Sequence, residues 1–447
     1  MTAARREGGD QALDVTAGAQ SPKDDPPRRK ADAARIAQML ATIAKIGADP
    51  AGGISRLAFT DGEGKAHELV GGWLRDLGLV VKRDPVGNTI GELAGRRNDL
   101  PAIGIGSHLD SVPRGGRFDG IAGVVGAVEV ARILGTGPLI DRPLRIVCFA
   151  AEEGARFGEP CIGSRAVVGM LERRDLSQLL DLEGISVASA MAAVGLEPAR
   201  LAEARWDAAD WAAFLELHVE QGRVLEATDS HIGLVDVVSG STRLMLTVAG
   251  RADHSGGTPM RLRADALAAA AEIILACEQL ALDKRHRGMR MTVGYMRVLP
   301  NSITTIPGRV TLAVDVRDTD SDRQRRGAAE VISGGRQICQ RRGVTFDARV
   351  IADTSPAVLP TWLREITSAS CRELGLDPLV LSSGASHDAQ VVNRLVPSGM
   401  VFVPSRDGLS HVPEEWSSSA DIAVGADVLM SSIVRLDEFL SSAEPSA

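Results

Sequence analysis

The sequence predicts an α/β protein in which a mostly parallel sheet domain is interrupted by an inserted ferredoxin-like α+β domain. Between about residues 100 and 220, continuous apolar runs of strand length alternate with helical stretches, which is typical of a parallel sheet covered by helices on both faces. Between about residues 238 and 350 the order is strand, helix, strand, strand, helix, strand, as in a ferredoxin-like domain. At 447 residues the chain is also long for one compact unit.

The segments follow one another in a consistent order along the chain. Residues 1–30 are polar and rich in Gly, Pro and charge, so they are predicted to form a disordered tail. Residues 31–237 and 353–447 are assigned to the main domain, which opens on an amphipathic helix and closes on another helix. Residues 238–352 are assigned to the insertion. In its strand "GRVTLAVDVR" apolar residues alternate with others, so one face is expected to pack on helices while Arg317 lies on the other.

Apolar runs mark the remaining strands. In the main domain these are "PAIGIG", "LRIVCFA", "AFLELHV" and "MVFVPS", and in the insertion they are "STRLMLTVAG", "MRMTVGYMRV" and "TFDARVI". Helices are expected over "GIAGVVGAVEVARIL", "RADALAAAAEIILACEQL" and "DRQRRGAAEVISGGRQICQRRG".

Composition narrows the class of protein. The formal net charge of −8 gives no sign of a nucleic acid or an anionic membrane as partner. No apolar run reaches membrane-spanning length, and the N-terminus has no apolar signal core. The five cysteines are scattered and form no CxxC motif, which is typical of reduced thiols in a cytoplasmic protein.

Histidine and carboxylate side chains follow four of the predicted main-domain strands. His108 follows "AIGIG", the pair Glu152 and Glu153 follows "LRIVCFAA", His218 follows "FLEL", and His411 comes shortly after "MVFVP". Ligands of an open α/β sheet bind at the carboxyl ends of its strands, so these side chains are expected at one edge. A single loop histidine is more often solvated or hydrogen-bonded than a ligand, and we keep that interpretation for three others: His67, His231 and His286.

These residue types together favour a two-metal site. Divalent ions such as zinc take histidine nitrogen and carboxylate oxygen, and two ions about 3.5–4 Å apart need a carboxylate to bridge them. A further carboxylate that binds no metal can accept a proton from water. The stretch "GSHLDSVPRGGRFDG" holds His108, Asp110 and Asp119 among four glycines, which would let the backbone turn sharply enough to bring His108 and Asp119 to one pair of metal ions.

Seven motifs resemble one known group, the metal-dependent amidohydrolases of the M20 peptidase superfamily. They occur in the family's order and are "GSHLDSVPRGGRFDG", "AAEEGARFGEPCIGSRA", "LELHVEQGRVLE", "GRADHSGGTPM", "IPGRVTLAVDVRD", "SGASHDA" and "VPSRDGLSHVPEEW". "LHVEQG" is similar to the hydantoinase/carbamoylase branch, since many other M20 peptidases have a carboxylate where His218 stands. The resemblance implies a dinuclear metal hydrolase domain with an inserted lid and dimerisation domain, and a homodimer built through that insertion.

The resemblance also implies that each subunit binds two divalent ions, Zn²⁺ or Mn²⁺, with Co²⁺ or Ni²⁺ as alternatives. His108 and His218 would bind the first ion, Glu153 and His411 the second, and Asp119 would bridge both.

Two neighbours of these ligands take other roles by the same resemblance. Glu152 would be the general base, and Asp110 would orient the imidazole of His108. The peptide bond between Asp119 and Gly120 is expected to be cis, as in M20 relatives.

The substrate contacts implied by the resemblance lie in both the insertion and the main domain. His254 would polarise the carbonyl and stabilise the oxyanion, and Arg317 would hold a substrate carboxylate. Gln221 would contact the ureido group. Around the substrate the resemblance further places Asn301, Gly384, Ala385 and His387. The sequence departs from the branch at Thr304, where Asn is usual, and at Ser386, where Gly is usual.

The implied activity is hydrolysis of the carbamoyl amide of N-carbamoyl-L-amino acids or related ureido acids. A metal-bridging hydroxide would attack, with Glu152 as the base. Allantoate amidohydrolase is the first alternative, and an aminoacylase or dipeptidase is the second. A catalytically silent binding protein is disfavoured, because the ligands and the base are all present.

Overall fold

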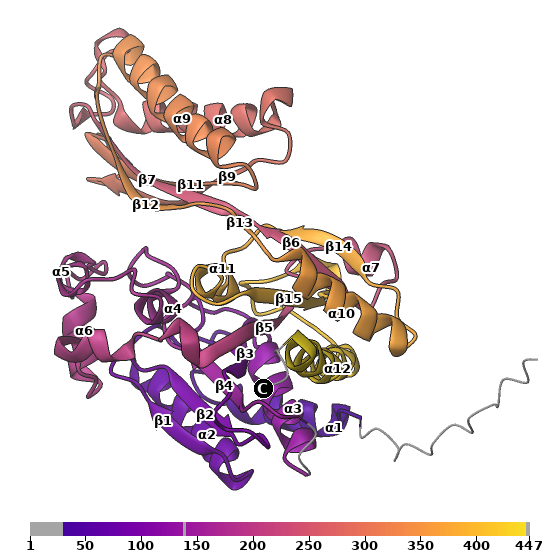
Figure 1. Cartoon of the computed structure of the whole chain (residues 1–447). Helices are drawn as coiled ribbons and strands as arrows, with labels where there is room; N and C mark the ends of the chain where they lie inside the picture. Colours follow the sequence, from indigo (N-terminus) through magenta and orange to yellow (C-terminus); the bar gives the residue numbers. More distant parts are fainter. Residues whose placement is uncertain (1–29, 137–139, 444–447) are drawn as a thin grey trace, which may run out of the picture.

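Two bodies make up the part of the chain that the computed structural model describes, residues 30–136 and 140–443 (Figure 1). The lower body in that view holds a nine-stranded sheet, and the upper body holds a four-stranded sheet with two long helices. Except for Lys30, the predicted tail of residues 1–30 lies outside the described residues. Within the described ranges, no helix combines the length and apolar character needed to cross a membrane.

The nine-stranded sheet is parallel at its centre and antiparallel towards its edges. Strands β4, β3, β5 and β15 lie side by side and run parallel, which confirms the predicted parallel core. Strands β1, β2 and β13 pair antiparallel at the two edges. In spatial order the strands are β1 (Val80–Arg83), β2 (Thr89–Leu93), β4 (Leu144–Phe149), β3 (Ala102–His108), β5 (Trp211–Val219), β15 (Ser398–Val403), β6 (Gly233–Val238) and β13 (Ala357–Val358), with β14 (Leu379–Ser383) paired to β6.

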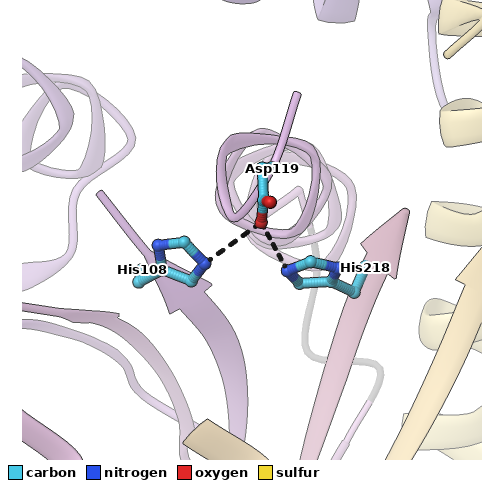
Figure 2. A group of neighbouring side chains, drawn as sticks. All are labelled: His108, Asp119 and His218. Carbon is cyan, nitrogen blue, oxygen red and sulfur yellow. Dashed lines mark ion pairs between the residues drawn. The ribbon is translucent and has the colours of Figure 1, made fainter. Parts of the chain in front are cut away.

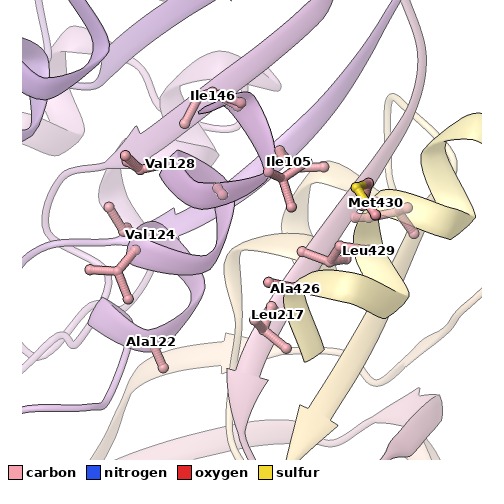
Figure 3. Close-up of a cluster of buried hydrophobic side chains, with 14 of the residues drawn as sticks. Ile105, Ala122, Val124, Val128, Ile146, Leu217, Ala426, Leu429 and Met430 are labelled. Atoms are coloured by element: carbon pink, nitrogen blue, oxygen red, sulfur yellow. The ribbon is translucent and has the colours of Figure 1, made fainter. Parts of the chain in front are cut away.

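Helices cover both faces of this sheet because its central strands are apolar on both sides. On one face Ile105 and Leu217 pack against Val124 and Leu429 of the covering helices (Figure 3). The helices of this layer are α1 (Ala33–Ile43), α2 (Asp61–Asp76), α3 (Ile121–Leu134), α10 (Thr361–Glu373) and α12 (Ser419–Ala443). The opposite face is covered by shorter helices, α4 (Ile162–Val167) and α11 (Asp388–Val392). Three more short helices are α5 (Arg173–Gln178), α6 (Val187–Ala193) and α7 (Val224–Ala227).

The upper body has the strand order of a ferredoxin-like fold, β12-β7-β11-β9, with every neighbouring pair antiparallel. The alternating apolar residues of β11 are buried against the two helices, as their period of two predicts. Along the chain the elements are β7 (Gly240–Ala249), α8 (Ala266–Leu282), β9 (Arg290–Leu299), β11 (Arg309–Asp318), α9 (Ser321–Arg342) and β12 (Thr345–Thr354). A separate two-stranded ladder pairs β8 (Asp253–His254) with β10 (Thr305–Ile306).

Two strand-to-strand connections join the bodies. The chain passes from β6 to β7 through Ser239, and returns from β12 to β13 within three residues. The four-stranded unit therefore spans residues 240–354, where the sequence placed the insertion at 238–352. Helices α8 and α9 lie on the side of this sheet away from the main body, so its uncovered face is turned towards the main body (Figure 1).

Candidate active site

The five predicted metal ligands meet at the carboxyl edge of the parallel strands. His108 is the last residue of β3, and His218 lies at the end of β5. Asp119 directly precedes Gly120, the N-cap of α3. Glu153 lies in the loop after β4, and His411 in the loop between β15 and α12. The strand order β4-β3-β5-β15 therefore carries these loops to one place, as expected for a parallel sheet.

The carboxylate of Asp119 is the centre of this cluster. Its Oδ1 lies 3.1 Å from Nε2 of His218 and 3.5 Å from Nε2 of His108 (Figure 2). Its Oδ2 lies 3.2 Å from Nε2 of His411, and that nitrogen is also 3.2 Å from Oε2 of Glu153. The two carboxylate oxygens of Asp119 thus face two different groups of side chains.

Each group offers three ligand atoms within 4.8 Å of one another. One group is His108, Asp119 and His218, and the other is Asp119, Glu153 and His411. Imidazole nitrogen with carboxylate oxygen is the donor set that zinc and similar divalent ions take. Nδ1 of His218 lies 2.9 Å from the carbonyl oxygen of Val219, which can only accept. That nitrogen therefore carries a proton, which leaves Nε2 as the ring atom that can bind a metal ion beside Asp119. The residues present fit two metal ions that share Asp119.

Electrostatics at the cluster favour bound positive charge. Burial raises the pKa of Asp119, but His108, His218 and His411 together lower it well below its usual range. The side chain of His411 is 48% exposed, and its partial desolvation opposes protonation, yet the charge of Glu153 and the contact with Asp119 raise its pKa to about 11. The carboxylates therefore attract positive charge, whether protons on the imidazoles or a metal cation.

The turn from Asp119 into α3 requires glycine at position 120. Gly120 has a φ of 68°, and a Cβ atom there would lie 2.5 Å from Cε1 of His108. This positive φ makes the turn that places Asp119 beside His108. The prediction of a cis bond between Asp119 and Gly120 is wrong. Among the described residues, the cis peptide bond is that between Leu299 and Pro300.

Asp110 ties three of the site residues together. Its Oδ1 accepts a hydrogen bond from the backbone N–H of Glu152 at 2.8 Å, and its Oδ2 accepts one from that of Glu153 at 3.1 Å. Oδ1 also lies 3.5 Å from Nδ1 of His108. The carboxylate is buried, so these contacts fix both the loop after β4 and the imidazole of His108.

Asp110→Asn is expected to weaken metal binding by about 10- to 100-fold, because the amide cannot accept at both positions while it orients His108. Competition with a chromogenic chelator measures the affinity. Asp99→Asn, at an exposed position on the main body, is the matched control. Equal affinities for the Asp110 and Asp99 variants would contradict the orienting role.

Glu152 belongs to neither group of ligand atoms but lies beside them. Its Oε2 is 3.8 Å from Nε2 of His108, and its Oε1 accepts from Sγ of Cys161 at 3.1 Å. Burial of this carboxylate raises its pKa to about 7. A carboxylate with that pKa can accept and return a proton near neutral pH.

Sequence reasoning missed three polar residues that support the cluster. Oγ of Ser410 lies 2.9 Å from Oδ2 of Asp119 and 2.7 Å from Oε2 of Glu415, and its single proton can be donated to one of the two at a time. Oε1 of Glu415 accepts from the backbone N–H groups of Phe118 and Asp119. Both residues flank His411 in the motif "LSHVPEEW", so their place in that loop was an available signal.

The third missed residue is Glu216, which is fully buried two positions before His218 on β5. It accepts from Oγ of Ser107 at 2.7 Å and from the backbone N–H of Ala389 at 2.8 Å. These bonds connect β3, β5 and α11 directly beneath the cluster. A carboxylate inside the apolar run "FLELHV" was the signal that could have indicated it.

A cleft of about 1600 Å³ opens beside this cluster and is lined by residues of both bodies. Nε2 of Gln221 donates to Oδ2 of Asp119 at 2.6 Å. Arg317 reaches across from β11, and its Nη1 donates to the carbonyl oxygen of Gly384 at 3.1 Å. The cleft therefore brings together five of the predicted residues: Gln221, Arg317, Gly384, Ala385 and His411.

Three predicted substrate contacts lie elsewhere. His254 is exposed on β8, where its Nδ1 accepts from the backbone N–H groups of Gly256 and Gly257. Asn301 is exposed as well, and neither residue lines the cleft. His387 is buried behind the cluster, with its ring centroid 4.5 Å from that of His218. Burial lowers its pKa well below the usual range, so His387 is neutral there. The roles of these three residues stay predictions.

Known proteins resemble the chain along most of its length. A model of peptidase family M20/M25/M40 matches residues 104–435. The N-carbamoyl-L-amino acid amidohydrolase of Geobacillus stearothermophilus is 40% identical over 404 residues, which cover 90% of this chain and 98% of that protein. The ureidoglycolate hydrolase of Oryza sativa subsp. japonica is 32% identical over 410 residues, covering 91% and 85%. The crystal structure of an amidase of the hydantoinase/carbamoylase family from Burkholderia vietnamiensis has a TM-score of 0.86 at 34% identity, covering 91% of this chain and 98% of that one.

Proposed function

Because the chain belongs to peptidase family M20/M25/M40 and is a hydrolase of linear amide C–N bonds, we propose that its substrates are N-carbamoyl-L-amino acids or related ureido acids. The observation that carries the proposal is the arrangement around Asp119. Two groups of ligand atoms share this carboxylate, and Glu152, which belongs to neither, lies beside them. The similarity to the amidohydrolase of Geobacillus stearothermophilus supports the substrate class.

Two divalent ions, Zn²⁺ or Mn²⁺, would occupy the site. His108 and His218 would hold one, Glu153 and His411 the other, and Asp119 would contribute one oxygen to each. When bound, the ions would activate a water molecule and polarise the substrate carbonyl. Asp110 would keep His108 and the loop of Glu153 in place through the contacts described above.

The proton transfers would fall to Glu152. Its carboxylate would take a proton from the water that attacks the carbamoyl carbon and return it to the leaving nitrogen as the C–N bond breaks. The products are the amino acid and carbamic acid, which decomposes to CO₂ and ammonia. Arg317 would hold the α-carboxylate of the substrate, and Gln221 would contact its ureido group. Stabilisation of the oxyanion by His254 stays a prediction, since that residue is exposed and outside the cleft.

Ammonia release from a substrate panel tests the proposal. The metal-reconstituted protein is given N-carbamoyl-L-amino acids, allantoate, ureidoglycolate and dipeptides in parallel. The proposal expects the highest kcat/KM for the carbamoyl amino acids. Preference for allantoate or ureidoglycolate would support the second candidate function, which the similarity to the rice ureidoglycolate hydrolase favours. Cleavage of dipeptides alone would contradict both.

Arg317→Ala is expected to raise KM for N-carbamoyl-L-alanine and to lower kcat/KM. The fall in kcat/KM should correspond to a loss of about 1.5–3 kcal/mol of transition-state stabilisation, the cost of a lost charge-assisted contact. An arginine fork matches a carboxylate in two parallel hydrogen bonds. The control substrate is N-carbamoyl-L-alaninamide, which has no carboxylate and should lose little. An equal loss for both substrates would show that Arg317 is structural.

A further inference from the structure

The uncovered face of the four-stranded sheet presents positive charge to the cleft. The residues of this sheet that line the cleft include four arginines, Arg243, Arg290, Arg317 and Arg349, but a single carboxylate, Asp315. That carboxylate is already engaged, because it accepts from Nε of Arg317 at 2.9 Å and from Oγ of Ser241 at 2.6 Å. The side of the cleft that this sheet forms therefore carries more positive charge than the sheet's own side chains neutralise.

Two of these arginines are direct neighbours across adjacent strands. In the antiparallel register of β11 and β9, Arg317 and Arg290 are paired residues. Like charges at directly opposite positions on one sheet face repel each other. Arg317 is compensated by Asp315, and its Nη1 bonds the carbonyl of Gly384. Within the described part of the chain, Arg290 has neither an ion pair nor a hydrogen bond through its side chain.

The guanidinium of Arg290 nevertheless lies at a defined place. A Cβ atom at Gly384 would be 2.8 Å from Nη1 of Arg290 and 3.2 Å from its Cζ, so this position accommodates the guanidinium only because it is glycine. The loop that carries Gly384 is also the one that Arg317 contacts. Both guanidinium groups therefore lie against one residue at the wall of the cleft, and only one of them has an anionic partner.

Resting on the proposed function, we infer that Arg290 forms a second anion subsite for the substrate, and that the preferred ureido acids carry an acidic side chain. Arg317 would hold the α-carboxylate, and Arg290 would pair with the side-chain carboxylate. N-Carbamoyl-L-glutamate and N-carbamoyl-L-aspartate have this chemistry. The second carboxylate would supply the negative charge that the paired arginines lack, and the planar fork of arginine matches its geometry.

Matched substrates isolate this contact. N-Carbamoyl-L-glutamate and N-carbamoyl-L-glutamine have nearly the same shape and differ in one side-chain charge. We expect the Mn²⁺-reconstituted protein to prefer the glutamate compound, and Arg290→Ala to reduce the ratio of the two kcat/KM values by about 10- to 100-fold, as for loss of a hydrogen-bonded charge pair. Arg349→Ala is the matched control, because Arg349 lines the same cleft on β12 and does not contact Gly384. That control should keep the wild-type ratio.

Two outcomes would overturn the subsite. The wild-type protein could show no preference for the acidic substrate, or Arg290→Ala could slow both substrates equally, as when both arginines grip one α-carboxylate. Because Arg290 is exposed and forms no ion pair, the variant is expected to fold, which thermal unfolding checks.

Binding separates this inference from the proposed function. Calorimetric titration of the metal-free full chain with the same two compounds requires no turnover. If no compound of the N-carbamoyl-L-amino acid panel is hydrolysed, the proposed function fails, while tighter binding of the glutamate compound that disappears in Arg290→Ala would still support the subsite. Binding without such a preference would overturn the subsite whatever the turnover.

Discussion

Glu152→Gln is expected to lower kcat by a factor of about 10² or more while both metal ions remain bound. The glutamine side chain has nearly the same shape but cannot accept a proton from water. Glu152 lies within reach of the cluster without belonging to either group of ligand atoms, so its replacement should spare the metals. Ammonia release gives the rate, and elemental analysis of the dialysed protein gives the metal content. Metal loss equal to the activity loss would show that Glu152 is a ligand and that the two glutamates have exchanged roles.

Asp119→Ala is expected to abolish binding of both ions and, with it, detectable turnover. The reason is geometric, since one carboxylate oxygen faces His108 and His218 and the other faces His411. No other carboxylate in the described residues belongs to both groups of ligand atoms. Metal stoichiometry after dialysis against a fixed free concentration of Zn²⁺ measures the effect.

Glu153→Gln is the comparison for Asp119→Ala. Glu153 belongs only to the group that contains His411, so its loss should weaken one site and spare the other. The account expects less than one ion per chain for the Asp119 variant and about one for the Glu153 variant, with two for the wild type. An Asp119→Ala protein that keeps one ion at the wild-type affinity would contradict the bridging role.

The fold was predictable where local patterns dominate. The run "AIGIG" has no alternation of polar and apolar residues because β3 is covered on both faces, and that pattern indicated a buried parallel strand. The alternation in β11 indicated a sheet with one covered face for the same physical reason. The mixed edge of the main sheet was not predicted. Strand β13 contains two residues, too few for any period to be visible.

The site residues were predictable where a histidine or a carboxylate directly follows a strand. His108, His218 and the loop of Glu153 could be placed at one edge because parallel strands end together. Ser410 and Glu415 contact Asp119, which lies nearly 300 residues earlier in the sequence. Sequence spacing alone therefore does not reveal these contacts. The conformation at Gly120 was assigned from the resemblance and was wrong, since a positive φ makes the turn.

The residues of the insertion were the hardest to place. Whether a side chain of the four-stranded unit reaches the metals depends on how the two bodies are oriented, and no local pattern encodes that orientation. Arg317 was predicted from the exposed face of its strand and lines the cleft. His254 was predicted from the resemblance alone and lies outside the cleft. Arg290 was not predicted as a site residue, because its position beside Arg317 depends on the register between β9 and β11.

Metal titration of turnover tests whether the protein needs two ions that share Asp119. The full chain is stripped of metal with a chelator and titrated with Mn²⁺ while ammonia release from N-carbamoyl-L-glutamate and bound metal are measured on the same samples. We expect no turnover in the metal-free protein and a maximal rate at two bound ions per chain, as two ligand groups sharing Asp119 require. Full turnover by the metal-free protein, or a maximal rate at one bound ion, would contradict this expectation.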